Sequence, residues 1–220
     1  MAINVQSFGL NDRSTTRIHR AGAAAIAGAI ALALSLLGHD VARVMGFDGT
    51  INTPGTLGFF LSYASLTVGW GLLFVGSLGF AWMAFRSDGR LLKGGVSLVS
   101  LGLGGTTLGF GFAALVDLVG RGDLAMMGEI IGAISMMIVF TLGSLVAGVA
   151  LVRSKIVSRT IAWLMVATGP AMLLGALVVP VGTGLDLLLF AGPLCAAWIL
   201  IGRELLATNT TAAEPDAVTA

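Results

Sequence analysis

Residues 94–117 read GGVSLVSLGLGGTTLGFGFAALVD, an apolar run that follows Lys93 and ends at Asp117. A transmembrane helix needs about 20 mostly apolar residues, so this run is long enough to cross a bilayer. No charged residue occurs within it before Asp117. We therefore predict a membrane-spanning helix here, and five other parts of the chain repeat the pattern.

Composition agrees with several crossings. The chain has 220 residues, of which 56% are hydrophobic and only 10% are charged, whereas a soluble domain has about 25% charged residues. We predict an all-α integral membrane protein, a compact bundle of six transmembrane helices at residues 21–41, 57–84, 94–117, 125–151, 160–180 and 185–202. We expect residues 1–20 to form a cytoplasmic N-terminal segment, 21–203 the transmembrane domain, and 204–220 a disordered cytoplasmic tail.

The distribution of basic residues predicts the orientation. If every run crosses the bilayer, ten of the 12 Lys and Arg residues share one side and only Arg43 and Arg121 lie on the other. Cytoplasmic loops are enriched in Lys and Arg, so we predict a multi-pass protein of the cell membrane with both termini in the cytoplasm. The ten residues are Arg13, Arg17, Arg20, Arg86, Arg90, Lys93, Arg153, Lys155, Arg159 and Arg203.

The first run follows a basic leader, as the apolar core of a signal peptide does. Its apolar stretch, residues 21–38, is longer than the usual 7 to 15 residues of such a core, so we interpret it as a retained span. Arginine outnumbers lysine and both Ala and Gly are abundant. This bias is typical of a GC-rich prokaryotic genome.

Small residues at helical spacing predict which faces of the helices touch. In lipid, helices associate where Gly, Ala and Ser allow their backbones to approach closely. Gly105, Gly109 and Ala113 are four residues apart, and the next step is Asp117. We expect this stripe to face other helices. Similar sets are Ala21, Ala25, Ala29 and Ala33; Ser62, Ser65, Gly69 and Gly76; Gly128 and Gly132; and Ser144 and Gly148.

Ionisable side chains from several helices should lie at similar depth near the outer boundary. Intramembrane carboxylates are functional candidates, so one interpretation is a cation or proton site. Asp117 is the strongest candidate, because the C-terminus of a helix is unfavourable for an anion. The other interpretation is a solvated rim, in which Arg121 pairs with Asp117 four residues before it. The candidate site comprises His39, Asp40, Asp117, Glu129 and Asp186.

Two Gly-Pro pairs, Gly169-Pro170 and Gly192-Pro193, fall near the middle of the fifth and sixth predicted spans. Proline inside a helix removes a hydrogen-bond donor and frees the carbonyl four residues earlier. Such breaks near the midplane line substrate sites in transporters. Neighbouring helices also satisfy simple proline kinks, and the sequence leaves both interpretations open.

Motifs of known chemistry are absent. The sequence has no H-E-x-x-H, no G-x-S-x-G and no phosphate-binding G-x-x-x-x-G-K. Its one cysteine is Cys195, and its two histidines, His19 and His39, lie about 30 Å apart at 1.5 Å per residue. We therefore predict no bound metal, no cofactor, no nucleic-acid partner and no enzymatic activity.

These observations favour an accessory or scaffold subunit that packs with the bilayer and with other membrane proteins. One alternative is a small cation- or proton-coupled transporter or channel that uses the outer carboxylates and the Gly-Pro breaks. A weaker alternative is a membrane enzyme acting at the outer face, with Asp117, Glu129 and His39 as acid and base.

Overall fold

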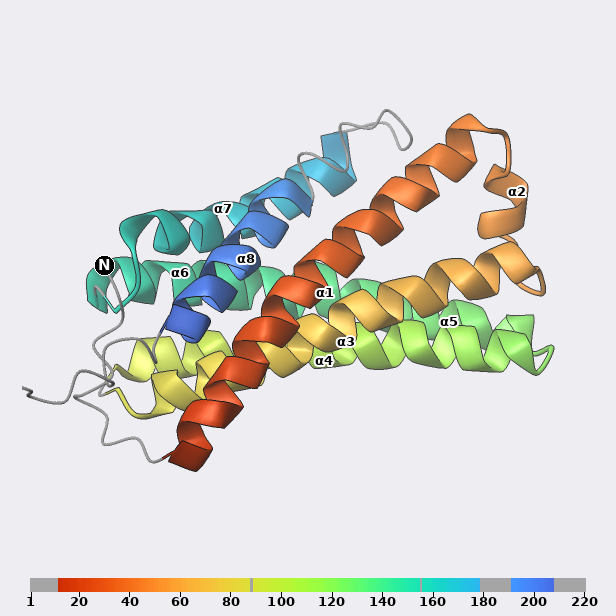
Figure 1. Ribbon diagram of the computed structural model, residues 1–220. Helices are drawn as coiled ribbons and strands as arrows, with labels where there is room; N and C mark the ends of the chain where they lie inside the picture. The colour runs from red at the N-terminus through yellow and green to blue at the C-terminus, as the bar shows by residue number, and fades with distance from the viewer. Residues whose placement is uncertain (1–11, 88, 155, 179–190, 208–220) are drawn as a thin grey trace, which may run out of the picture.

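The computed structural model describes residues 12–87, 89–154, 156–178 and 191–207. Within these ranges the regular structure is entirely helical, which confirms the predicted all-α class for the described chain (Figure 1). The elements are α1 (Asp12–Val44), α2 (Asp48–Ile51), α3 (Leu57–Phe85), α4 (Arg90–Leu118), α5 (Gly122–Ile134), the π-helix η2 (Ser135–Phe140), α6 (Thr141–Ser154), α7 (Arg159–Val178) and α8 (Gly192–Ala207).

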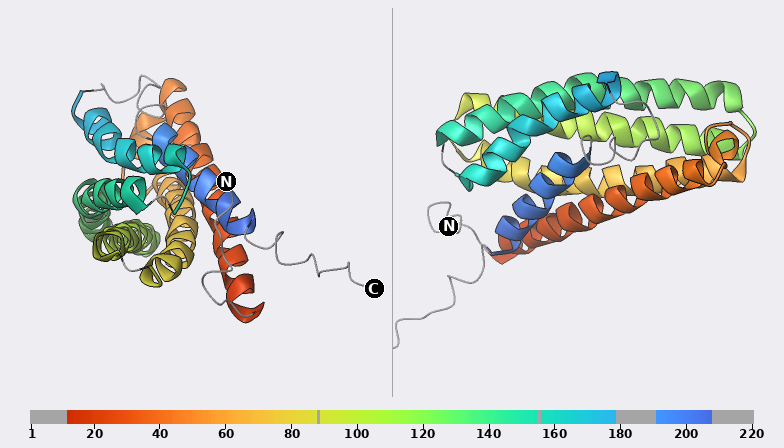
Figure 2. Two further views of the ribbon diagram at one scale, coloured as in Figure 1. Left: turned by 90° about the vertical axis from the view of Figure 1, so that its left-hand side faces the viewer. Right: turned by 90° about the horizontal axis from the view of Figure 1, so that it is seen from above.

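The helices form a closed ring. The elements α5, η2 and α6 follow one another without interruption, so together they make one rod. Helix α1 packs on α3, α3 on α4, α4 on the α5–η2–α6 rod, and α6 on α7. Helix α8 packs on both α7 and α1, which closes the ring (Figure 2).

Four helical segments, one of which is the α5–η2–α6 rod, are long and apolar enough to cross a membrane. They cover Thr15–Val44, Leu57–Phe85, Arg90–Leu118 and Gly122–Ser154. The apolar helix at Arg159–Leu174 is shorter, and the described part of α8 has 16 residues. The structure therefore supports a membrane protein with four long apolar helices.

Two helices extend beyond the predicted spans. Helix α1 begins at Asp12, inside the segment expected to precede the first span. It does so because Ile18, only 1% exposed, packs into the bundle. Helix α8 continues to Ala207, past the predicted start of the tail, because Leu205 is also buried. Residues 208–220 of the predicted tail lie outside the described residues.

The fourth predicted span is one helical rod, Gly122–Ser154, in whose middle six residues form the π-helix η2. At its end the Thr141 hydroxyl donates to the carbonyl of Met136, five residues earlier, at 3.4 Å. Phe140 is fully buried and its ring meets that of Trp70 edge to face at 6.2 Å. Its backbone lies against Gly102 of α4, where no Cβ would fit. This central contact between three rods depends on the glycine.

Glycines bring several rods into backbone contact. A Cβ placed on Gly109 would lie 2.7 Å from the carbonyl oxygen of Gly128, and one placed on Gly69 would lie 2.9 Å from the amide nitrogen of Leu32. Ala113, next in the stripe after Gly109, is fully buried. The prediction that this stripe faces protein is confirmed. Helices of the same chain, not a separate partner, pack against it.

Charged residues gather at the two ends of the ring, which we name by their charge. The basic end holds the beginnings of α1 and α7, the turn between α3 and α4, and the end of α8 (Figure 1). The acidic end holds α2, the end of α1 and the turn between α4 and α5. These ends correspond to the two sides predicted from the sequence.

Candidate functional site

The candidate residues lie at the acidic end, and Asp117 is the most buried of the carboxylates there. It is 6% exposed, and its Oδ1 accepts a hydrogen bond of 2.5 Å from the backbone N–H of Gly55. Gly55 lies in the loop between α2 and α3 with φ +86, a conformation that glycine adopts at low cost. Asp117 therefore ties the end of α4 to the loop that precedes α3.

The end of α4 determines which residues Asp117 can reach. The N–H of Gly120 donates to the carbonyl of Asp117 at 2.9 Å, and that of Arg121 donates to the carbonyl of Val116 at 2.9 Å. Together with φ +76 at Gly120, these bonds form a Schellman motif, in which a left-handed glycine ends the helix. The chain reverses there, so Arg121 is not one helical turn beyond Asp117.

The predicted pairing of Asp117 with Arg121 is therefore wrong. The Nε of Arg121 lies 3.2 Å from Oδ1 of Asp123, and the two side chains are 58% and 67% exposed. Beside this carboxylate the pKa of the Arg121 guanidinium is raised. This pair is exposed to solvent, and Asp117 is not part of it.

Glu129 of α5 is held by the aromatic residues of α3. The carboxylate of Glu129 interacts with the hydroxyl of Tyr63. The Tyr63 ring stacks on Phe59 at 4.3 Å and meets Phe110 of α4 edge to face at 5.5 Å. Because Tyr63 is only 8% exposed, its hydroxyl needs a polar partner. The Glu129 carboxylate of α5 lies close enough to interact electrostatically with this hydroxyl, so α5 and α3 meet here.

His39 and Asp40 lie on α1, on the other side of α3. Nδ1 of His39 lies 3.1 Å from Oγ of Ser62, which links α1 to α3. His39 and Ser62 line a pocket of about 450 Å³ between α1, α2 and α3. Asp40 follows His39 and is partly buried. Neither Asp117 nor Glu129 lines this pocket, and Asp186 lies outside the described residues.

The structure does not join these candidates into one cluster. Asp117 contacts Gly55, Glu129 contacts Tyr63, and His39 contacts Ser62. Among the described residues no group of three or more His, Cys, Asp or Glu side chains could hold a metal ion. These residues instead make three separate contacts, each of which links a helix to a neighbouring helix or loop.

The two Gly-Pro pairs occupy different positions in their helices. Pro170 lies inside α7, which continues to Val178, and Gly169 packs against Thr141 and Ser144 of α6. The described part of α8 begins at Gly192, directly after the π-helical residue Ala191, and Pro193 is its second residue. Pro170 therefore lies inside a described helix, whereas the predicted break at Gly192-Pro193 falls at the edge of the described residues and stays a prediction.

Two residues of these ties were not predicted from the sequence. Tyr63 is the only tyrosine of the chain, and a single phenol within an apolar run signals a buried polar partner. Gly55 follows Pro54, and a Pro-Gly pair marks a turn. The sequence does not show that the amide in this turn reaches α4, because the two partners are 62 positions apart.

No protein-family model, no curated protein and no solved structure matches this chain. We therefore infer its function from the described contacts alone.

Proposed function

We propose that the chain is a six-span protein of a prokaryotic cytoplasmic membrane, with both termini inside, that serves as an accessory subunit for other membrane proteins. It catalyses no reaction in this proposal. The observation that carries the proposal is the engagement of Asp117 and Glu129 in ties within the bundle. Carboxylates used in this way stabilise a fixed fold, whereas a carrier needs carboxylates that bind and release ions.

A row of exposed leucines on the outside of α4 supports the accessory role. Leu101, Leu108 and Leu115 are 66%, 74% and 65% exposed and recur every seven residues. A seven-residue repeat presents one continuous row to a neighbouring helix. The small-residue seams are occupied within the chain, so this leucine row is where we place a partner helix.

Site-specific crosslinking tests the accessory role. In intact membranes, a photoreactive amino acid at Leu108 should crosslink the chain to one partner protein. The product should be a single band of defined higher mass, and mass spectrometry identifies the partner. The matched control is Val75, an exposed apolar residue of α3, which should give no discrete adduct. Equal behaviour at the two positions, with no protein adduct at either, would reject the accessory role.

Flux measurements test the same proposal from the other side. Vesicles containing the purified protein should conduct protons, Na⁺ and K⁺ no faster than empty vesicles. A flux that is present in the wild type and abolished by Asp117→Asn would replace the accessory role with cation or proton transport.

A specific observation favours the transporter as the second candidate. The π-helix η2 ends at Phe140, and Gly169 beside Pro170 packs on the next residue, Thr141. Irregular turns of two neighbouring helices therefore meet in the interior. π-Turns occur frequently at functional sites, and interrupted helices line the binding sites of transporters. In this case Pro170→Ala should abolish a flux that the wild type supports, while its melting temperature stays near the wild-type value.

A further inference from the structure

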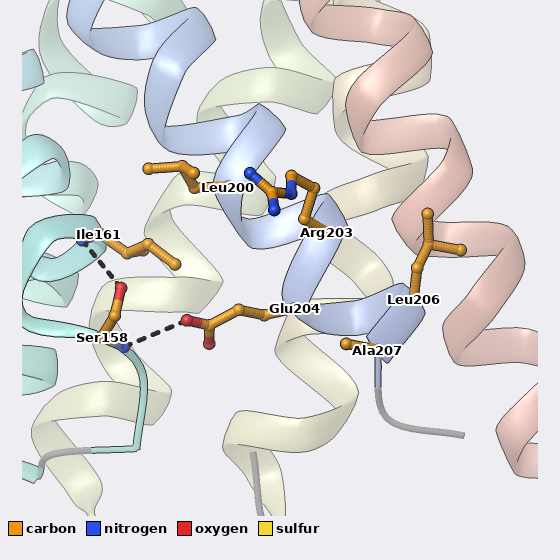
Figure 3. Close-up of a pocket in the computed structure, with 7 residues that line it drawn as sticks. All are labelled: Ser158, Ile161, Leu200, Arg203, Glu204, Leu206 and Ala207. Atoms are coloured by element: carbon orange, nitrogen blue, oxygen red, sulfur yellow. Dashed lines mark hydrogen bonds between the residues drawn. The ribbon is translucent and has the colours of Figure 1, made fainter. Parts of the chain in front are cut away.

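A second pocket lies at the basic end, far from the candidate site. Its volume is about 510 Å³, within the range of roughly 300–1,000 Å³ of typical ligand pockets. Helix α8 forms one wall, and the turn before α7 forms the other (Figure 3). Its lining combines apolar side chains with two charged groups: Ile161, Leu200 and Leu206 with Arg203 and Glu204, beside Ser158 and Ala207.

The carboxylate of Glu204 is incompletely satisfied. Its Oε1 accepts a hydrogen bond from the backbone N–H of Ser158 at 3.3 Å, longer than the usual 2.7–3.2 Å. Its Oε2 is buried and has no hydrogen-bond partner among the described residues. A buried carboxylate oxygen without a donor is costly, and none of the described residues supplies a donor to Oε2 of Glu204.

The position of Glu204 increases that cost. It lies in the last turn of α8, where the helix dipole disfavours an anion and favours a cation. Arg203 precedes it, but Figure 3 shows the guanidinium directed toward Leu200, away from the carboxylate. A cation with N–H donors, placed in the pocket, would relieve both the missing hydrogen bond and the unfavourable dipole.

The pocket also provides for a negative group and for acyl chains. Arg203 is exposed at the pocket wall, and guanidinium groups bind phosphate in a bidentate manner. Leu200 and Ile161 continue the wall toward the apolar part of the bundle. The surrounding cations at this end, among them Arg153 and Arg159, are typical of the lipid headgroup level.

We propose that this pocket binds a phospholipid with a primary amine, such as phosphatidylethanolamine. The ammonium group donates to Glu204, the phosphate binds Arg203, and an acyl chain lies along Ile161 and Leu200. The long bond to Ser158 allows the carboxylate to turn and present Oε2 to the amine. The proposal needs only that the chain lies in a membrane, so it does not depend on the accessory role.

The amine provides a sharp test, because phosphatidylcholine has the same charges and acyl chains but no N–H donor. Native mass spectrometry of the full chain, with each lipid added to detergent micelles, should show about tenfold tighter binding of phosphatidylethanolamine. This factor corresponds to the lower end of the contribution of a hydrogen bond to a charged group. Mono- and dimethylated phosphatidylethanolamine should bind with intermediate affinity. Equal binding of all four lipids would overturn the proposal without any variant.

Variants locate the preference within the chain. Glu204→Gln keeps the size of the side chain but removes its charge, and should abolish the preference for the primary amine. The matched control is Arg159→Gln, a cation of the same end outside the pocket lining, which should retain it. A preference that survives Glu204→Gln, or disappears equally in the Arg159 variant, would contradict the proposed site. The same spectra would reveal a second copy of the chain instead of lipid, and such a Glu204-dependent dimer would also contradict it.

Discussion

The two ends of the bundle differ in whether their polar side chains have interaction partners within the described chain. At the acidic end Asp117, Glu129 and His39 each contact a protein group from another part of the chain. At the basic end Glu204 keeps one buried oxygen without a partner, beside a pocket lined by Arg203. Polar groups satisfied internally stabilise the fold, whereas an unsatisfied group at a pocket needs a ligand from outside. We therefore assign structure to the acidic end and lipid binding to the basic end.

The largest expected effect comes from filling the packed seam toward the acidic end. Gly109→Leu should lower the free energy of unfolding by about 1–3 kcal/mol, because the added atoms meet the backbone of α5 instead of a flexible side chain. Gly94→Leu is the matched control on the same helix at the basic end, where an added Cβ meets nothing within 4 Å. Thermal unfolding in detergent should show a drop for position 109 only, and equal drops would contradict the described packing.

Removing the tie between α4 and the α2–α3 loop should have the next largest effect. Asp117→Ala leaves the N–H of Gly55 without its acceptor and should cost about 1–2 kcal/mol. Its control is Asp123→Ala, which removes an exposed carboxylate paired with Arg121 and should change the melting temperature far less. If the two variants melt alike, Asp117 is not a structural tie and the assignment of the acidic end fails.

A smaller loss is expected at the aromatic tie. Tyr63→Phe keeps the stacking with Phe59 but removes the hydroxyl that contacts Glu129. The expected cost is about 0.5–1.5 kcal/mol, the usual net contribution of one hydrogen bond. A double-mutant cycle with Glu129→Gln measures the coupling directly, and strict additivity would show that the two groups do not interact.

The smallest effect on stability is expected at the basic end, where a substitution should leave stability unchanged or increase it. In bilayers of phosphatidylcholine alone, Glu204→Leu should leave the melting temperature unchanged or raise it, because it removes a carboxylate that lacks a donor. In bilayers with phosphatidylethanolamine the wild type should gain stability by ligand binding, and the variant should not. If Glu204→Leu lost as much stability in phosphatidylcholine as Asp117→Ala does, Glu204 would be a structural residue. The proposed difference between the two ends would then be wrong.

The sequence by itself determined the helices and the separation of charge. An apolar run in lipid must satisfy its backbone hydrogen bonds internally, so length and composition are enough to predict a helix. Residues 94–117 therefore fall within α4, and most of the described basic residues lie at one end. The stripe from Gly105 to Ala113 could also be predicted locally, because residues four positions apart lie on one face of a helix. In the structure this face packs against the α5–η2–α6 rod.

Only the tertiary structure decided the partners of the polar groups and the local breaks in the helices. The contact of Asp117 with Gly55 joins positions 62 residues apart, and that of Glu204 with Ser158 joins positions 46 apart. The π-helix that places Phe140 against Gly102 likewise depends on a neighbouring rod. Local spacing favoured Arg121 for Asp117, but the left-handed turn at Gly120 removed that neighbour. Helix formation is a local consequence of burial in lipid, whereas the choice of a polar partner depends on which backbones the packed ring brings together.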